Sequence, residues 1–123
     1  MSDLEKDRVG LFGELADNNY MREFKFDFGT GVTANGEPLS AETVNAGIKA
    51  LMLLASELAG GASLIARNGC WIDGGKLIEE PGFTLVVLAD YDCCSVALVD
   101  EIKVRFQQKS VFVTETFVNA QLR

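Results

Sequence analysis

The residues best suited to chemistry lie in one stretch, Asn68 to Asp90, and just before it. The stretch holds the only tryptophan, Trp71, and two adjacent carboxylates, Glu79 and Glu80. Successive side chains of a strand point to opposite faces, so the two glutamates are not expected to share a proton as a catalytic pair. Arg67 could hold an anion while Trp71 stacks on a planar group. This pattern suggests a binding site at the mouth of a pocket, with ordinary structural or surface charge as the alternative.

Two residues near the start of the first expected strand complete the candidate site. Arg22 shares its strand face with Phe24, so on an open face it would need an anion or an ion pair. The alternative interpretation places Arg22 at the solvent-exposed end of the strand. Tyr20, together with Arg67 and Glu79, is a candidate for acid–base work. The candidate ligand-binding residues are therefore Arg67, Trp71, Asp73, Glu79, Arg22 and Tyr20.

Acidic side chains concentrate around the same stretch. The chain has a net charge of −7 and an isoelectric point near 4.5, which argues against nonspecific binding to nucleic acid or to anionic membranes. Between Asp73 and Asp92, five acidic residues accompany a single base, Lys76. One interpretation is a solvated end of a hairpin, and the other is a surface for a basic protein partner. That surface would comprise Asp73, Glu79, Glu80, Asp90 and Asp92.

Several kinds of chemistry lack the residues they need. The sequence has no histidine, which removes the commonest general base near neutral pH and the commonest metal ligand. Cys93 and Cys94 are adjacent, whereas zinc ligands usually have CxxC spacing, so we expect packing thiols there, with a redox-sensitive thiol as the alternative. The GTG sequence that begins at Gly29 lacks the GxxxxGK[ST] pattern of a phosphate loop. We therefore expect no catalytic set, no metal and no cofactor.

The cysteines and the first residues bear on the cellular compartment. The three cysteines are an odd number, which is poor material for a disulfide framework and fits a reducing compartment. The opening run MSDLEKDR is charged and lacks the apolar centre of a secretory signal. No apolar run approaches the roughly 18 residues that a membrane span needs. These features predict a cytoplasmic protein.

Alternation and turn residues predict four strands. Tyr20 to Phe28 alternates phenylalanines with charged residues, which is typical of a half-buried strand. The other strands are expected over residues 62–73, 76–90 and 110–118. Gly74-Gly75 joins the second strand to the third, and Pro81-Gly82 predicts a bulge or an edge bend.

Two amphipathic helices are expected between the strands. Ser40 caps the first helix and Gly60-Gly61 ends it. Its apolar stripe comprises Val44, Ile48, Leu51, Ala55 and Leu58, and the neighbouring Met52, Leu53 and Leu54 suggest contact with a partner subunit. Asp92 caps the second helix, whose apolar stripe comprises Val96, Val99, Ile102 and Phe106.

The order β-α-β-β-α-β predicts a ferredoxin-like α+β fold. Right-handed crossovers give the sheet order 4-1-3-2, with the first and third strands central. Two helices would cover one face of this four-stranded antiparallel sheet. The other face would be solvated, paired with a second sheet, or used for a ligand. We expect one domain over residues 20–123, preceded by a short helix or arm over residues 1–19.

Two runs resemble a bacterial family of small domains of unknown function. The first is Asn68 to Asp73 with Gly75 and Leu77-Ile78-Glu79, and the second is Arg105 to Val111. Members of the family carry a G-x-W-x-D, glycine, R/I-E hairpin and an F-x-Q-x-S-V junction between helix and strand. The resemblance spans Arg22 to Thr114 and implies a dimeric ferredoxin-like fold. It implies no catalytic residue and leaves residues 1–18 outside.

Three functions remain open, and the first is favoured. The first is a non-catalytic binding module, a homodimer that holds a small ligand or a protein partner. The second is an acidic inhibitor or decoy, such as a phage-type accessory protein, that occupies a basic nucleic-acid-binding protein. The third is a small enzyme of the α+β-barrel kind. The absence of a catalytic set favours a protein that is not an enzyme, and the net charge of −7 argues against direct contact with nucleic acid or membrane.

Overall fold

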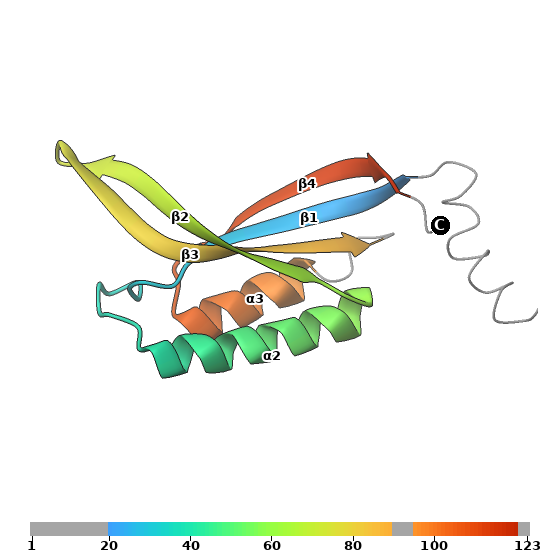
Figure 1. Ribbon diagram of the computed structural model, residues 1–123, viewed down its shortest axis with the longest axis horizontal. Helices are drawn as coiled ribbons and strands as arrows, with labels where there is room; N and C mark the ends of the chain where they lie inside the picture. Colours follow the sequence, from blue (N-terminus) through green and yellow to red (C-terminus); the bar gives the residue numbers. More distant parts are fainter. Residues whose placement is uncertain (1–19, 90–94, 121–123) are drawn as a thin grey trace, which may run out of the picture.

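A four-stranded antiparallel sheet forms one layer of the protein and two helices form the other (Figure 1). The computed structural model describes residues 20–89 and 95–120. The elements are β1 (Tyr20–Gly29), α2 (Ala41–Ala59), β2 (Ser63–Asp73), β3 (Lys76–Ala89), α3 (Ser95–Phe106) and β4 (Phe112–Asn119). The strands lie in the order β2-β3-β1-β4, so the ferredoxin-like order and the central positions of β1 and β3 are confirmed.

The alternation in β1 places its phenylalanines in the core. Phe24, Phe26 and Phe28 are all buried against the helices. The ring of Phe28 lies 4.9 Å, between centroids, from the ring of Phe106 at the end of α3. Burying a phenylalanine stabilises a fold by about 1.5–3 kcal/mol, so these rings fix which face of β1 points to the helices.

α2 begins and ends as its sequence predicts. The Ser40 hydroxyl accepts a hydrogen bond from the Thr43 N–H at 3.1 Å, and Gly60 ends the helix with a φ of 77°. Leu51 and Ala55 are buried, but Leu58, which was expected in the stripe, is exposed. The stripe instead includes a buried glycine, Gly47, whose added Cβ would lie 2.9 Å from the Phe106 ring.

The apolar stripe of α3 differs from the expected one. Its buried residues are Leu98, Ile102 and Phe106, whereas Val96 is exposed. Residues 96–99 are all apolar, so periodicity alone allows two stripes through the first turn. In the structure the buried row is Leu98, Ile102 and Phe106, at four-residue spacing, because these side chains pack on the phenylalanines of β1.

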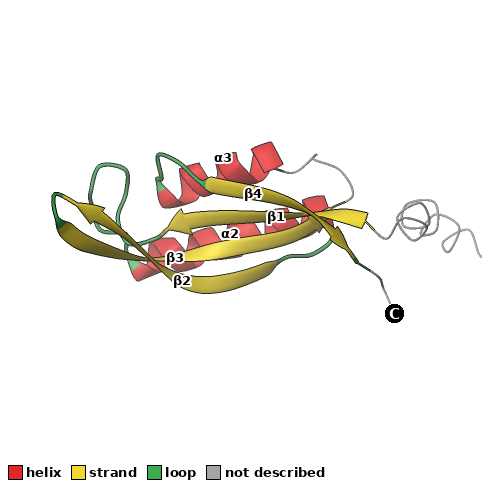
Figure 2. Cartoon of the chain, turned by 90° about the horizontal axis from the view of Figure 1, so that it is seen from above, coloured by secondary structure: helices red, strands yellow, loops and turns green. Residues whose placement is uncertain are grey.

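Pro81-Gly82 marks the place where β1 stops pairing with β3. The β2–β3 ladder continues through both residues without an extra residue, so the expected bulge is absent from the described strand. The last pair between β1 and β3 is Gly29 with Gly82. Figure 2 shows β2 and β3 extending past the start of β4.

Some expectations fall outside the described residues. They are the N-terminal helix or arm over residues 1–19, the helix cap at Asp92, and the packing thiols Cys93 and Cys94. In the described parts of the chain, neither helix is long and apolar enough to cross a membrane.

Candidate binding surface on the hairpin arm and the open sheet face

β2 and β3 continue as a two-stranded ribbon beyond the rest of the sheet. Their pairing runs from Ser63–Val86 to Asp73–Lys76, while β1 reaches only Gly82. We call residues 68–81 the hairpin arm. Figure 1 shows the arm rising away from the two helices toward its tip. A two-stranded ribbon is only marginally stable by itself in water, so the arm gains little stability from its own pairing.

The arm exposes large apolar side chains on both of its faces. Trp71 pairs with Ile78 on one face, and Ile72 pairs with Leu77 on the other. Trp71, Ile72 and Leu77 are 47%, 74% and 63% exposed. Single exposed apolar residues are ordinary on a protein surface, whereas three large ones lie close together near the tip of this ribbon, outside the core.

The three predicted ligand-binding residues of β2 lie in a row and do not converge. Arg67, Trp71 and Asp73 occupy alternate positions on one face of β2. Because a strand rises about 3.3 Å per residue, Arg67 and Asp73 lie about 20 Å apart. Glu79 pairs with Cys70, so it lies on the opposite face of the arm. One chain therefore offers these groups as a strip along the arm.

The two candidates on β1 lie at its far end. The Arg22 Nε is 3.3 Å from the Glu115 Oε1, and the guanidinium carbon lies 5.5 Å from the centre of the Phe117 ring. The charge of Arg22 is thus matched by an ion pair and an aromatic face. Tyr20 begins β1 and pairs with Asn119. The length of β1 separates both residues from the arm, so the structure does not bring them to Arg67.

The structure describes three of the five residues that were predicted to form the acidic surface. Asp73 and Glu79 are exposed on the arm. Glu80 is half-buried, and its Oε1 accepts a hydrogen bond from the Val32 N–H at 3.3 Å. Asp90 and Asp92 lie outside the described residues. The two exposed carboxylates, Asp73 beside Lys76 at the tip and Glu79 further down the arm, therefore lie on opposite faces and do not form one patch.

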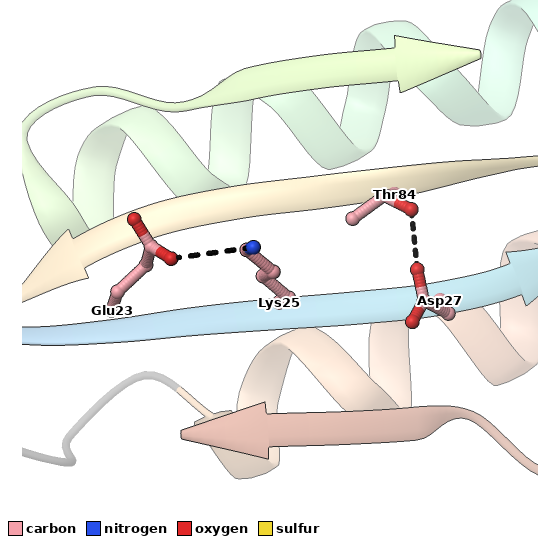
Figure 3. A network of polar contacts seen from close by, with 4 residues as sticks. All are labelled: Glu23, Lys25, Asp27 and Thr84. Carbon is pink, nitrogen blue, oxygen red and sulfur yellow. Dashed lines mark hydrogen bonds and ion pairs between the residues drawn. The ribbon is translucent and has the colours of Figure 1, made fainter. Parts of the chain in front are cut away.

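The face of the sheet away from the helices carries a row of polar side chains on β1 (Figure 3). The Lys25 Nζ lies 3.6 Å from the Glu23 Oε1, and the Thr84 hydroxyl donates a hydrogen bond to Asp27 (Figure 3). The Nε of Arg67 lies 3.9 Å from the Oδ1 of Asp27. Opposite charges thus balance each other along the row.

Sequence reasoning did not identify Asp27 or Thr84 as part of this network. The alternation in β1 placed Asp27 on the charged face, but its partners depend on strand register. Thr84 stands directly opposite Asp27, and β2 brings Arg67 to the neighbouring position, opposite Gly82. The sequence feature that points to this network is Thr84 within the apolar run of β3, because a hydroxyl group at such a position needs a hydrogen-bond partner.

Apolar side chains flank the polar row on the same open face. Register places Ile65 opposite Thr84, Leu88 opposite Glu23, and Phe112 opposite Asp27. All three apolar side chains are exposed. The open face therefore has a charge-balanced polar centre with an apolar border.

The described residues offer few groups for chemistry. Within residues 20–89 and 95–120, no three cysteine, aspartate or glutamate side chains gather closely enough to hold a metal ion. Cys70 is a free, exposed thiol on the arm. The arm and the open face can therefore contact a ligand or another protein through aromatic side chains, apolar side chains and ion-paired charges.

The sequence matches no protein-family model, and no curated protein matches it significantly. Among solved structures, the periplasmic divalent cation tolerance protein CutA from Archaeoglobus fulgidus is 16% identical, with 84% of this chain and 89% of that chain covered and a TM-score of 0.54. A phage SAM lyase in its apo state is 15% identical, with 85% and 94% covered and a TM-score of 0.55. The divalent cation tolerance protein from Thermus thermophilus is 13% identical, with 84% and 87% covered and a TM-score of 0.51.

These likenesses confirm the fold and nothing finer, because all three identities are low. The chain is a small α+β protein of the ferredoxin-like kind, as the two resembling runs implied. The particular family of unknown function stays a prediction, since no family model matches.

Proposed function

We propose that this protein is a non-catalytic interaction module that associates with further copies of itself through the hairpin arm. The observation that carries the proposal is the exposure of Trp71, Ile72 and Leu77 on a ribbon that extends beyond the sheet. Covering those side chains removes apolar surface from water, which is the main driving force of protein association. A homodimer is the smallest assembly of this kind.

The outer edge of β4 supports a second copy as the partner. β4 lies at one end of the sheet, and its sequence, FVTETFVN, contains neither proline nor lysine. Such an edge has free backbone groups and few of the features that prevent strand pairing. Every copy carries the exposed arm, and no other strand within residues 20–89 and 95–120 pairs with the outer edge of β4. Self-association therefore supplies a partner for each of these surfaces.

A small ligand is the second part of the proposal, and it would bind where copies meet. Arg67 and Trp71 form a strip within one chain, so a neighbouring chain would supply the opposite wall of a site. One structural neighbour is a phage SAM lyase in complex with S-methyl-5′-thioadenosine. That compound is a sensible first probe, because its adenine could stack on Trp71. The cytoplasmic location stays a prediction.

The test of self-association compares two double variants of the full chain by sedimentation velocity. Trp71→Ser with Ile72→Ser changes the arm. Val96→Ser with Val104→Ser changes two valines on α3, 72% and 74% exposed, and serves as the matched control. We expect the wild type and the α3 variant to sediment as oligomers and the arm variant as a monomer. Equal sedimentation of all three proteins would contradict the proposal.

The ligand is tested separately by isothermal titration with S-methyl-5′-thioadenosine. Binding to the wild type and its loss in Trp71→Ala would support a site on the arm. Heat of binding that is unchanged in Trp71→Ala and Arg67→Ala would place any site elsewhere and overturn this part of the proposal.

A further inference from the structure

Two side chains from separate parts of the fold hold the backbone of one loop residue, Val32. Glu80, at the base of the hairpin arm, accepts the Val32 N–H at 3.3 Å. Gln108, between α3 and β4, donates from its Nε2 to the Val32 carbonyl at 2.8 Å. Gln108 is the glutamine of the F-x-Q-x-S-V run that the sequence singled out. Both polar groups of a single residue thus connect the arm to the α3–β4 junction.

On the arm side, the contact is close because the loop has glycines. A Cβ at Gly29 would lie 2.4 Å from the Glu80 Oε1, and one at Gly31 would lie 3.2 Å from the Pro81 Cδ. The Thr30 N–H also donates to the Pro81 carbonyl at 2.9 Å. The GTG sequence therefore forms the backbone surface on which the base of the arm rests.

At the α3–β4 junction, both main-chain and side-chain hydrogen bonds hold the chain against the loop. The Ala34 N–H donates to the Gln107 carbonyl at 2.7 Å. Gln107 has a φ of 48°, which turns the chain out of α3. The Gln108 amide also donates to the Phe106 carbonyl at 2.9 Å. The junction is therefore held in a defined conformation against the loop.

The loop between these contacts has its own internal bonds. The Thr33 N–H donates to the Glu37 carbonyl at 2.7 Å, and the Leu39 N–H donates to the Gly31 carbonyl at 3.0 Å. Val32 and Pro38 form an isolated bridge. Leu39 directly precedes Ser40, the cap of α2. Because these bonds tie the loop together, a displacement of Val32 also displaces the neighbouring loop residues.

We infer that Glu80, Val32 and Gln108 form a linkage that couples the position of the hairpin arm to the α3–β4 junction. Loss of the Gln108 contact removes one of the two side-chain bonds to Val32, which loosens the loop and, through it, the contact of the Glu80 carboxylate at the base of the arm. The linkage lies within one chain and goes beyond the proposed self-association. The orientation of the arm relative to the sheet therefore depends on Gln108, a residue that does not contact the arm.

The test is hydrogen–deuterium exchange, read by mass spectrometry, on full-length Gln108→Ala. The loss of one hydrogen bond predicts exchange about fivefold faster in arm residues 76–81, relative to core residues 24–28 in the same protein. Lys109→Ala is the matched control, since Lys109 is the exposed neighbour of Gln108. The reciprocal variant, Glu80→Ala, should speed exchange at residues 107–111.

Faster exchange in Gln108→Ala that is confined to the loop and the junction would overturn the inference. Gln108→Glu, which removes the donor but keeps the size of the side chain, gives a second reading if the alanine variant folds poorly. Repeating the comparison in the Trp71→Ser, Ile72→Ser background separates this linkage from self-association. The effect on the arm should persist in that background, and its disappearance there would assign it to contacts between copies.

Discussion

Gly82 of β3 lies so close to Phe28 of β1 that an added Cβ would stand 2.2 Å from the Phe28 carbonyl oxygen. This is closer than real Cβ contacts come, and the obstacle is backbone on a central strand. The approach occurs where β1 stops pairing and the hairpin arm begins. The junction between sheet and arm therefore depends on a glycine at this position.

We expect Gly82→Ala to lower the free energy of unfolding by about 2–4 kcal/mol, because β1 and β3 must separate to admit the methyl group. Urea unfolding followed by far-ultraviolet circular dichroism measures this change. Gly61→Ala is the control, since nothing lies within 4 Å of a Cβ there, and it should change stability by less than about 0.5 kcal/mol. Equal effects of the two substitutions would show that the close approach is not present in solution.

Phe106 is the second position where a large effect is expected. Its ring packs on Phe28 and lies over Gly47, so it joins both helices to the sheet. Phe106→Ala should cost about 3–5 kcal/mol, because it leaves a cavity between three elements. Differential scanning calorimetry would measure the loss. Val104→Ala, at an exposed position of the same helix, should leave the transition nearly unchanged, and a Phe106→Ala transition equally unshifted would refute this packing.

Arg67→Ala should change stability little. Its ion pair with Asp27 is long, at 3.9 Å between Nε and Oδ1, and both side chains are partly exposed. Exposed pairs of this kind contribute about 0–1 kcal/mol, and salt weakens them further. Chemical unfolding at low and at high salt checks this expectation. A loss well above 1 kcal/mol would mean that Arg67 has a structural role, and its use as a probe of ligand binding would fail.

Local patterns predicted the elements of this fold, whereas packing decided their buried faces. The alternation of Phe24, Phe26 and Phe28 was sufficient to place β1 and its core face. In α3, four successive apolar residues left the buried stripe open, and only contact with the phenylalanines of β1 resolved it in favour of Leu98. A sequence period cannot choose between two apolar rows when both are present.

The candidate site was predictable as a list of residues but not as a geometry. Sequence placed Arg67, Trp71 and Asp73 on one strand, but their separation follows from the continuous ladder of the arm. The contact between Glu80 and Val32 joins residues far apart in the chain, and no local pattern indicates it. The two glycines that admit Glu80 and Pro81 belong to the GTG sequence, whose pattern suggests only an incomplete phosphate loop and not this contact.

Native mass spectrometry of the purified full chain is the sharpest test of self-association through the arm. We expect a mass that is a multiple of 13.3 kDa, and a shift toward the single-chain mass in the Trp71→Ser, Ile72→Ser variant. A bound small molecule would add to the oligomer mass and leave with the arm substitutions. A wild-type protein found only at the single-chain mass, at every concentration tested, would contradict self-association through the arm.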